Sequence, residues 1–360
     1  MSTDYKFEGW VGKDKDSVKG KMVWEDFTPK NWQEDNVDIE ISHCGICASD
    51  LHTLRAGWYP TNFPVVVGHE IIGKAVRVGK DVKHIKVGDR VGVGAQSGSC
   101  QNHKGDCPGC ADGEPQHCTH VVNTFDSPWP DDKKSFSKGG YANYWRGQGH
   151  WVIPIPDGLE SDVAAPMMCG GITAFSPLKR HGAGPGKKVG IIGVGGLGHF
   201  GIMGAKALGC DEVVAISRSS TKKSDAQKMG ATGFIATGED KDWALGEYAG
   251  KLDIIVSTVS DHNMPLQQYM SLLAFKGRFV QVGAPEDNLP GFNIFPLITK
   301  GASIWGSATG SPEAIADMLK FFAEKGVKTW NNNVPMKEAN QAVKDMDAGK
   351  ARYRYVLCNH

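Results

Sequence analysis

Hydrophobic and polar positions follow two different patterns along the chain, and the change falls near residue 156. Before it, short runs of aliphatic and β-branched residues are separated by Gly, Pro, Asn and Asp, which is typical of short strands in an irregular β-rich region. A polar stretch rich in Gly and Pro runs from Gly98 to Gly149, and a loop of that length indicates a function or a metal that holds it in place. The predicted strands are Val37–Ser42, Val65–Val67, Ile71–Val78 and Arg90–Val93.

After about Pro156, strand patterns alternate with helical ones. The segment His199–Leu208 is apolar at a helical period, and Gly209 is placed to end it. Ser311 and Pro312 are typical of the start of another helix. Strands that alternate with helices of this length predict βαβ units and a parallel sheet. The predicted strands are Lys188–Ile192, Val213–Ser217, Gly233–Ala236, Asp253–Thr258, Arg278–Val282 and Ser303–Gly306.

Length and composition then narrow the class of protein. A chain of 360 residues is long enough for about two domains. Its 40 basic and 40 acidic residues cancel, which argues against a broad nucleic-acid or polybasic membrane surface. We find neither a long apolar run nor an apolar leader, so we expect no transmembrane helix, no secretory signal and a cytoplasmic protein. Disulfides are rare there, so the clustered members of the 9 cysteines are expected to bind metal.

A glycine-rich turn follows the first predicted strand of the second half. The strand Lys188–Ile192 leads into the sequence Gly-Val-Gly-Gly-Leu-Gly, and a predicted helix follows. Such glycines allow a tight turn and close approach of the backbone to a pyrophosphate, which lies at the positive end of the helix dipole. We therefore expect dinucleotide binding, with a plain glycine-rich turn as the alternative. The residues expected to contact the cofactor here are Gly193, Gly195, Gly196, Leu197 and Gly198.

The next strand indicates which dinucleotide binds. An NAD site requires an acidic residue about 20 residues beyond the turn, for the ribose hydroxyls, but Val213–Ser217 runs into hydroxyl and basic side chains. Ser217, Arg218 and Lys222 can donate hydrogen bonds to a 2′-phosphate, and Arg218 suits bidentate contact. A solvated basic helix start is the alternative, but basic residues are unfavourable at a helix N-terminus. We therefore expect NADP(H).

Four cysteines lie close together in the polar stretch. Cys107 and Cys110 are separated by two residues, Cys118 follows after seven, and six residues separate Cys100 from Cys107. Four thiolates match a closed, tetrahedral structural zinc site, which would order a loop that has little core of its own. A disulfide or unliganded thiols are the alternatives, and His103 competes with Cys100 as the fourth ligand.

Further candidate ligands are dispersed along the chain. Cys47 follows one predicted strand, His69 and Glu70 follow another, and Cys169 comes much later. A single His beside a Glu is more often structural than metal-binding. Two Cys and one His, however, leave zinc a fourth position for water or substrate, which is the pattern of a catalytic site. Such a zinc acts as a Lewis acid that lowers the pKa of a bound oxygen or polarises a carbonyl.

Together these motifs resemble the zinc-containing medium-chain alcohol dehydrogenases, and within them the cinnamyl alcohol dehydrogenase branch with its NADPH-dependent fungal members. The resemblance covers nearly the whole chain. It implies an α/β protein, in which a GroES-like β-rich catalytic domain (1–157, completed by 305–360) accompanies a Rossmann cofactor domain (158–304) with a doubly wound parallel sheet. The segments that carry the resemblance are His43–Asp50, Val67–Glu70, Gly92–Gln96, Gly139–Ala142, Cys169–Thr173, Gly193–Gly198, Ser217–Lys222 and Arg352–Tyr355.

The resemblance assigns the catalytic zinc to Cys47, His69 and Cys169, with Glu70 able to approach it. The chain departs from the family at the structural site, where four extra residues separate the first two of the four cysteines. We still assign that second zinc to all four. The assigned ligands are Cys100, Cys107, Cys110 and Cys118.

The resemblance also implies a proton path and a set of contacts. Ser49 would pass the substrate proton toward the cofactor ribose and His52, for which a surface histidine is the alternative. Trp58, Tyr59 and Trp129 are candidate apolar walls for the substrate, with plain core or surface aromatics as the alternative. Further cofactor contacts are expected from Thr173, Thr258, Gly283 and Ser307.

The activity implied is reduction of aldehydes to primary alcohols, and the reverse oxidation, by an enzyme that uses zinc and NADPH. Aromatic, cinnamyl and medium-chain aliphatic aldehydes are the expected substrates, with no nucleic-acid or membrane partner and a homodimer joined near Ser303. An NAD-dependent zinc polyol dehydrogenase is the alternative enzyme, but Ser217-Arg218 and Cys169 weigh against it. The other alternative is a non-catalytic NADPH-binding protein on the same fold, which would be expected to have lost its zinc ligands.

Overall fold

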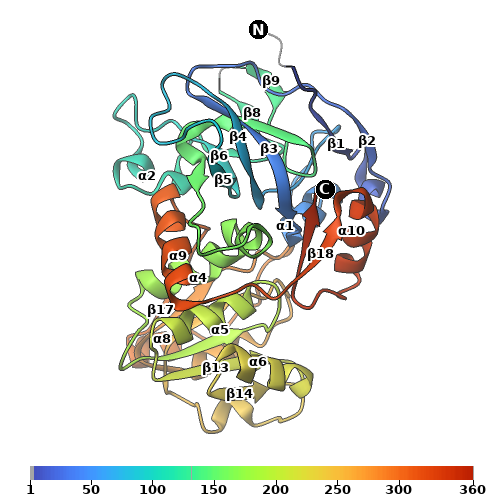
Figure 1. Cartoon of the computed structure of the whole chain (residues 1–360). Helices are drawn as coiled ribbons and strands as arrows, with labels where there is room; N and C mark the ends of the chain where they lie inside the picture. The colour runs from blue at the N-terminus through green and yellow to red at the C-terminus, as the bar shows by residue number, and fades with distance from the viewer. Residues whose placement is uncertain (1–3, 131, 360) are drawn as a thin grey trace. The chain divides into compact units, whose positions relative to one another are not determined.

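The computed structural model describes residues 4–130 and 132–359, within which no helix is long and apolar enough to cross a membrane. The chain forms two compact units, each with its own sheet (Figure 1). Each unit also has its own hydrophobic core. The first unit comprises Met1–Cys169, Gly310–Glu324 and Lys328–His360, and the second comprises Gly170–Thr309 and Lys325–Val327.

A seven-stranded sheet dominates the first unit. In spatial order its strands are β11 (Ile153–Pro154), β5 (Arg90–Val93), β4 (Ile71–Val78), β3 (Asn36–Gly45), β19 (Arg354–Cys358) and β18 (Asn331–Pro335), and β10 (Tyr144–Gln148) also pairs with β3. Ile39 and Ile41 of β3 are buried in the core. β19 runs antiparallel to β3 and places Val356 opposite Gly45. The C-terminal strand therefore lies beside the end of β3, from which the chain continues to Cys47.

Shorter elements complete the first unit. Three two-stranded sheets pair β1 with β2, β6 with β7 and β8 with β9. Their bounds are β1 (Glu8–Val11), β2 (Val23–Asp26), β6 (Gln96–Gly98), β7 (Val122–Asn123), β8 (Pro128–Trp129) and β9 (Asp132–Phe136). The helices are α1 (Ala48–Leu54), α2 (Pro108–Ala111), α3 (Ser161–Ala164), α9 (Pro312–Lys325) and α10 (Ala339–Asp347), with 3₁₀ turns η1 (Lys15–Lys19), η2 (Pro115–His117), η3 (Gly149–Trp151), η4 (Ala165–Met168) and η7 (Met336–Glu338).

The second unit is a six-stranded parallel sheet with helices between its strands (Figure 1). In spatial order the strands are β14 (Gly233–Ala236), β13 (Glu212–Ser217), β12 (Lys188–Ile192), β15 (Leu252–Ser257), β16 (Leu273–Gln281) and β17 (Ser303–Gly306). The order reverses between β12 and β15, and α/β sheets bind ligands at such a switch point. The helices are α4 (Gly170–Arg180), α5 (Gly198–Ala207), α6 (Lys223–Met229), α7 (Leu266–Ser271) and α8 (Phe295–Lys300), with 3₁₀ turns η5 (Ser220–Lys222) and η6 (Trp243–Leu245).

Most predicted strands are confirmed, and β4, β5, β12, β14 and β17 have the predicted bounds. The strand predicted at Val65–Val67 is wrong, because only Val65 pairs, in an isolated bridge to Gly12. The next two carbonyls accept hydrogen bonds from the irregular segment at Gly139 and Tyr141. The segment Val65–Val67 is therefore buried but does not pair as a regular strand. It is followed by Gly68, whose φ is +103°.

Candidate active site

Two groups of metal-ligating side chains come together in the first unit. In the first of these, here called the Cys47 group, Cys47, His69, Glu70 and Cys169 are all buried, and their ligand atoms lie within 4.8 Å of one another. Three separate segments supply them: the start of α1, the residues before β4, and the residue after η4. The fold thus assembles residues that are dispersed in the sequence.

Asp50 connects the two segments that carry Cys47 and His69. Cys47 is the N-cap of α1, and its backbone N–H donates to the Asp50 carboxylate at 2.8 Å. The same carboxylate accepts from the Gly68 N–H at 3.1 Å and from the Tyr141 hydroxyl at 2.9 Å. Burial raises the pKa of Asp50 to about 6. Three donors to one buried carboxylate fix both segments in place.

Glu70 is held by a guanidinium from the C-terminal strand. Nη2 of Arg354, in β19, donates to both carboxylate oxygens of Glu70 at 2.5 Å, and both side chains are buried. Gly45 makes room for this contact, because a Cβ at that position would lie 2.0 Å from Glu70 Oε2. Burial raises the pKa of Glu70 to about 7, although the charge of Arg354 opposes that rise.

The two thiols of the Cys47 group differ in acidity. The pKa of Cys47 lies well below its usual value, because it accepts a hydrogen bond from Cys169 and faces the positive charges of His69 and Arg354. The pKa of Cys169 is raised well above its usual value by that hydrogen bond and by burial. Burial lowers the pKa of His69, but the negative charges beside it, chiefly that of Cys47, outweigh burial and raise that pKa to about 9. The group therefore stabilises positive charge beside a thiolate.

An unpaired ring nitrogen lies within the same group. Nε2 of His69 is buried and has no hydrogen-bond partner among the described residues, and such a buried, unsatisfied atom costs about 1–3 kcal/mol. The imidazole stacks on Phe125, with 5.2 Å between centroids and 12° between planes. Two sulfurs, an imidazole nitrogen and a carboxylate oxygen form a donor set that binds zinc in proteins. These residues therefore fit a zinc ion.

Ser49 and His52 lie on α1, directly after Cys47. Ser49 Oγ is 3.6 Å from Cys47 Sγ, so the structure brings this hydroxyl to the metal-ligating group. The ring of His52 stacks on Trp58 at 4.3 Å between centroids. Tyr59, by contrast, is 81% exposed to solvent.

The second group, here called the Cys100 group, consists of Cys100, Cys107, Cys110 and Cys118. Cys100 Sγ lies 3.7 Å from Cys110 Sγ and 3.4 Å from Cys118 Sγ, and all nine cysteines of the chain are free. Backbone N–H groups of Cys100 and His120 donate to Cys118 Sγ at 3.4 and 3.2 Å. Backbone hydrogen bonds also lower the pKa of Cys107 to about 6, whereas burial raises that of Cys110 to about 12. Four sulfurs with backbone donors fit a closed zinc site.

The six residues between Cys100 and Cys107 fold back on themselves. The His103 N–H donates to the Cys100 carbonyl at 3.0 Å, and the Asn102 side chain accepts from the Cys107 N–H at 3.1 Å. Gln101 and Asn102 adopt left-handed backbone conformations, with φ of 47° and 57°. This closed turn brings Cys100 to the other three cysteines, while His103 lines an adjoining hollow of about 930 Å³.

Trp129 lies beside the Cys100 group. It is buried, its ring lies 4.5 Å from Lys30 Nζ, and it lines the same hollow as Cys100 and His103. These contacts do not link Trp129 to the Cys47 group, so its role as a substrate wall stays a prediction.

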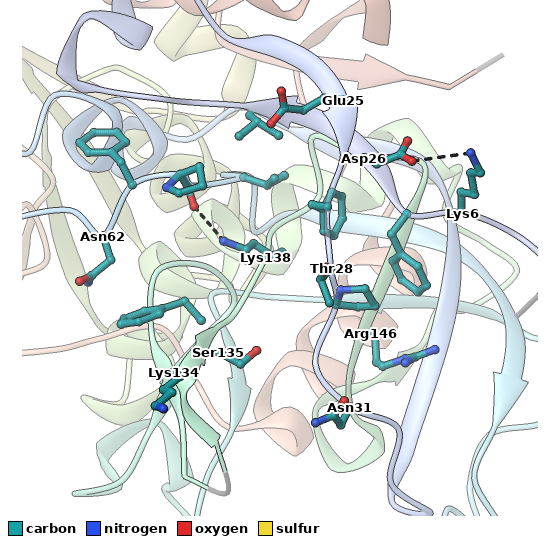
Figure 2. A pocket seen from close by; sticks show the side chains of 18 residues that line it. Lys6, Glu25, Asp26, Thr28, Asn31, Asn62, Lys134, Ser135, Lys138 and Arg146 are labelled. Carbon is teal, nitrogen blue, oxygen red and sulfur yellow. Dashed lines mark hydrogen bonds and ion pairs between the residues drawn. The ribbon is translucent and has the colours of Figure 1, made fainter. Parts of the chain in front are cut away.

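Another hollow of about 1090 Å³ lies in the first unit (Figure 2). Lys138 donates to the Pro64 carbonyl at 2.8 Å, and Lys6 pairs with Asp26 at 3.7 Å. Among the described residues that line it there is no member of either cysteine group. We therefore assign it no part in the metal sites.

The glycine-rich turn joins β12 to α5 in the second unit. Gly193 has a φ of +93°, and a Cβ at Gly198 would lie 1.6 Å from the Gly193 carbonyl oxygen, so the turn itself requires glycine at both positions. A Cβ at Gly195 would meet no atom within 4 Å. The space beside Gly195 is thus open to a ligand. Gly196 and Leu197 complete the turn before α5 begins.

The basic side chains predicted to bind a 2′-phosphate lie near this turn. Ser217 ends β13, and Arg218 follows it and is exposed. Lys222 Nζ donates to the carbonyl of Val194, within the turn, at 2.7 Å. The hydrogen bond brings this ammonium group to the glycine-rich turn, where the phosphates of a dinucleotide are expected.

The other predicted cofactor contacts fall mostly at the carboxyl ends of neighbouring strands. Thr258 follows β15 and donates from Oγ1 to the Ile192 carbonyl at 2.8 Å. Gly283 follows β16, and Ser307 follows β17. Thr173 lies on α4 and is buried. Their roles in cofactor binding stay predictions.

Comparisons with known proteins agree with both units. Residues 33–157 match the family model of the alcohol dehydrogenase GroES-like domain, and residues 196–324 match that of the zinc-binding dehydrogenases. NADP-dependent alcohol dehydrogenase 6 of Saccharomyces cerevisiae is 40% identical over 100% of this chain and 98% of its own length. Cinnamyl alcohol dehydrogenase 2 of Rauvolfia serpentina is 36% identical over 97% of this chain and 94% of its own.

Solved structures of cinnamyl alcohol dehydrogenases also match the chain. A cinnamyl alcohol dehydrogenase from Sorghum bicolor superposes with a TM-score of 0.91 at 32% identity, over 98% of each chain. The Helicobacter pylori enzyme complexed with NADP(H) superposes with a TM-score of 0.88, also at 32% identity and over 98% of each chain. The chain therefore belongs to the zinc-containing medium-chain alcohol dehydrogenases, in their cinnamyl alcohol dehydrogenase branch. The predicted α/β fold class, with its GroES-like and Rossmann parts, is confirmed.

Sequence reasoning missed several residues that support the Cys47 group. Asp50 and Tyr141 fall within motifs that carry the family resemblance, and Arg354 falls within the C-terminal one, but no spacing rule shows that they hold the ligand-bearing segments in place. Phe125 has no such signal, because its contact with His69 depends entirely on tertiary structure.

The two glycines of the turn give a matched test. Gly198→Ala should lower the thermal stability of the cofactor-free protein, since overpacking costs about 1–3 kcal/mol. Gly195→Ala should leave that stability unchanged but weaken NADPH binding, because its methyl group would occupy the open space. Thermal unfolding and titration of NADPH fluorescence check both. Wild-type NADPH affinity in Gly195→Ala would contradict the assignment of that space to the cofactor.

Proposed function

We propose that this chain catalyses the NADPH-dependent, zinc-dependent reduction of aldehydes to primary alcohols and the reverse oxidation. The observation that carries the proposal is a buried group of two Cys, one His and one Glu in the same chain as a glycine-rich turn with basic side chains nearby. Relatives named as NADP-dependent and cinnamyl alcohol dehydrogenases support it. A zinc ion held by Cys47, His69 and Cys169 would supply a Lewis acid for the carbonyl, and NADPH would supply the hydride.

The protein's own part is to hold the ligands and to move a proton. Asp50 fixes the Cys47 and His69 segments, and Arg354 keeps Glu70 at the edge of the group, from which we propose that it approaches the metal. These buried contacts prepare the site before substrate arrives, so little reorganisation is left for the reaction.

Ser49 is proposed to accept and hand on the substrate proton. Its hydroxyl lies beside Cys47 and can both donate and accept a hydrogen bond. His52 follows three residues later on α1, and residues three apart in a helix lie on the same side. We propose that His52 receives this proton on its way to solvent.

Cofactor selection is proposed to depend on Ser217, Arg218 and Lys222. Hydrogen bonds from charged donors to a phosphate are roughly twice as strong as neutral ones. The remaining cofactor contacts proposed from the second unit are Thr173, Gly193, Gly195, Gly196, Leu197, Gly198, Thr258, Gly283 and Ser307.

Trp58, Tyr59 and Trp129 are proposed as substrate walls, and Trp58 has the most support because it stacks on His52. The proposed substrates are aromatic, cinnamyl and medium-chain aliphatic aldehydes.

We also propose a cytoplasmic location, which the nine free cysteines support, since disulfides are rare there. The proposed domain division remains 1–157 with 305–360 for catalysis, and 158–304 for the cofactor.

We further propose a homodimer formed through β17. This strand lies at the edge of its sheet and exposes Ile304 and Trp305, and the nearby helix α8 exposes Phe295 and Ile298. An exposed apolar edge strand favours pairing with a second strand.

Charge at Ile304 should therefore disrupt the dimer. We expect Ile304→Lys to sediment as a monomer, while Leu245→Lys, at another exposed apolar position of the second unit, keeps the wild-type sedimentation coefficient. Sedimentation velocity makes the comparison, and a wild-type value for Ile304→Lys would place the interface elsewhere.

Charge reversal at Arg218 tests the cofactor assignment. Arg218→Asp should change the ratio of kcat/KM for NADPH to that for NADH by at least about tenfold in favour of NADH, because a charged hydrogen bond worth about 1.5–3 kcal/mol is lost. Lys223→Asp, which makes a similar change at the exposed first residue of α6, should have a smaller effect. Unchanged selectivity in Arg218→Asp would exclude the proposed phosphate contact, and wild-type preference for NADH would favour the polyol dehydrogenase alternative.

Loss of Cys47 tests the catalytic metal. Cys47→Ala should abolish turnover, leave NADPH binding nearly intact, and lower the zinc content from about two ions per chain to about one. Cys210→Ala removes a cysteine that belongs to neither group and should retain turnover. Steady-state kinetics, fluorescence titration and metal analysis give the three readouts. Turnover that survives in Cys47→Ala would contradict the proposed mechanism.

A further inference from the structure

The Cys100 group lies at one end of a small hairpin. β6 and β7 pair antiparallel, with Gly98 opposite Val122 and Gln96 opposite Asn123. Cys100 follows β6 by two residues, and Cys118 precedes β7 by four. The backbone N–H of Cys100 also donates to Cys118 Sγ at 3.4 Å. A metal bound by these cysteines would therefore hold the two strands together at this end.

The other end of the hairpin is equally well bonded. Thr124, just after β7, donates from its N–H to the Ala95 carbonyl at 3.0 Å and from Oγ1 to the Gly94 carbonyl at 2.5 Å. Ser97 Oγ donates to the Asn123 carbonyl at 3.2 Å. Thr124 and Ser97 are completely buried. The hairpin is thus a continuous hydrogen-bonded unit that leads from the Cys100 group to Phe125.

This second end contacts two segments of the Cys47 group. Phe125 stacks on the imidazole of His69, with nearly parallel rings. Gly94 lies so close to Met168, the residue before Cys169, that a Cβ at Gly94 would be 2.5 Å from the Met168 carbonyl oxygen. The hairpin therefore touches one ligand directly and the backbone next to another.

The stacking contact bears directly on the orientation of His69. Its Nε2 has no hydrogen-bond partner among the described residues, so this nitrogen does not fix the plane of the ring. Stacking on a buried aromatic ring restricts rotation of the imidazole about χ2, and stacked aromatic pairs contribute about 0.5–1.5 kcal/mol. Only 7% of Phe125 is exposed. The residue directly follows the hydrogen-bonded end of the hairpin.

We propose that Phe125 is a positioning residue for His69, and that the β6–β7 hairpin uses it to couple metal binding in the Cys100 group to metal binding in the Cys47 group. The proposal rests on the zinc ligands proposed above and adds a physical link between the two sites. Because a coupling free energy is reciprocal, a metal in either group strengthens binding in the other.

The first test compares two Phe→Leu variants. Phe125→Leu keeps an apolar side chain but removes the ring against His69, and Phe7→Leu makes the same change at a buried ring that packs on Tyr5 and Phe27 instead. The readout is the rate at which a chromogenic chelator removes zinc from the full chain. The Cys47→Ala variant identifies the kinetic phase that belongs to the Cys100 group.

We expect Phe125→Leu to release zinc from the Cys47 group about tenfold faster, as loss of a residue that supports a ligand commonly does. Release from the Cys100 group should become faster by a smaller factor, because the coupling between the two groups is reciprocal. Phe7→Leu should release both ions at wild-type rates, and Phe125→Tyr, which restores a ring, should do the same for the Cys47 group. Wild-type release from the Cys47 group in Phe125→Leu would overturn the inference and leave the proposed function intact. Absence of zinc from that group in the wild type would overturn both.

The second test measures the coupling itself. Cys110→Ser weakens the Cys100 group and should speed zinc release from the Cys47 group in the wild-type background, but much less in the Phe125→Leu background. If Cys110→Ser does not fold, Cys110→His, which keeps a zinc ligand, takes its place in the same cycle. Effects that simply add in the double variant would show that the hairpin does not connect the sites through Phe125.

Discussion

A buried ion pair between Glu70 and Arg354 joins positions of the first unit that lie 284 residues apart in sequence. Taking two charges out of water costs several kcal/mol per ion, and only close geometry with further hydrogen bonds offsets that cost. Here one guanidinium nitrogen reaches both carboxylate oxygens, Gly45 leaves space for them, and β19 is fixed by its pairing with β3. The C-terminal strand is therefore part of the support of the Cys47 group, because either charge would be buried and unpaired without the other.

The segments that carry the ligands around this ion pair are irregular. Their backbones lie very close to neighbouring backbones instead of pairing as regular strands. A Cβ at Gly139 would lie 2.5 Å from the Gly68 carbonyl oxygen, and one at Gly94 the same distance from that of Met168. Gly68 itself adopts a φ that other residues rarely take. The chain can thus place His69 and Cys169 beside one another only where side chains are absent. Gly68, Gly94 and Gly139 of the first unit allow close packing around the metal ligands, whereas Gly195 of the second unit leaves room for a ligand.

The sequence predicts best what is local. The strand before Gly193 and the helix after Gly198 follow from hydrophobic period and glycine spacing, and both are present in the structure. Val65–Val67 has the composition of a strand, but its partners are irregular segments, and composition carries no information about partners. The contact between Phe125 and His69 is invisible for the same reason, as is the burial of Trp129 beside the Cys100 group. The ligand types could be predicted, but the residues that orient them required the fold.

The insertion after Cys100 shows why a cysteine can remain a metal ligand when the loop that follows it becomes longer. Lengthening a flexible loop costs only about 0.6 kcal/mol for each doubling, so four extra residues between Cys100 and Cys107 cost about 1 kcal/mol of closure entropy. A structural zinc contributes about 10–16 kcal/mol in small zinc-binding peptides. The turn hydrogen bonds at His103 and Asn102 reduce the cost of closure further. The metal therefore dominates the free energy of this loop, so the four sulfurs come together despite the insertion, and strict spacing matters only where no metal holds the chain.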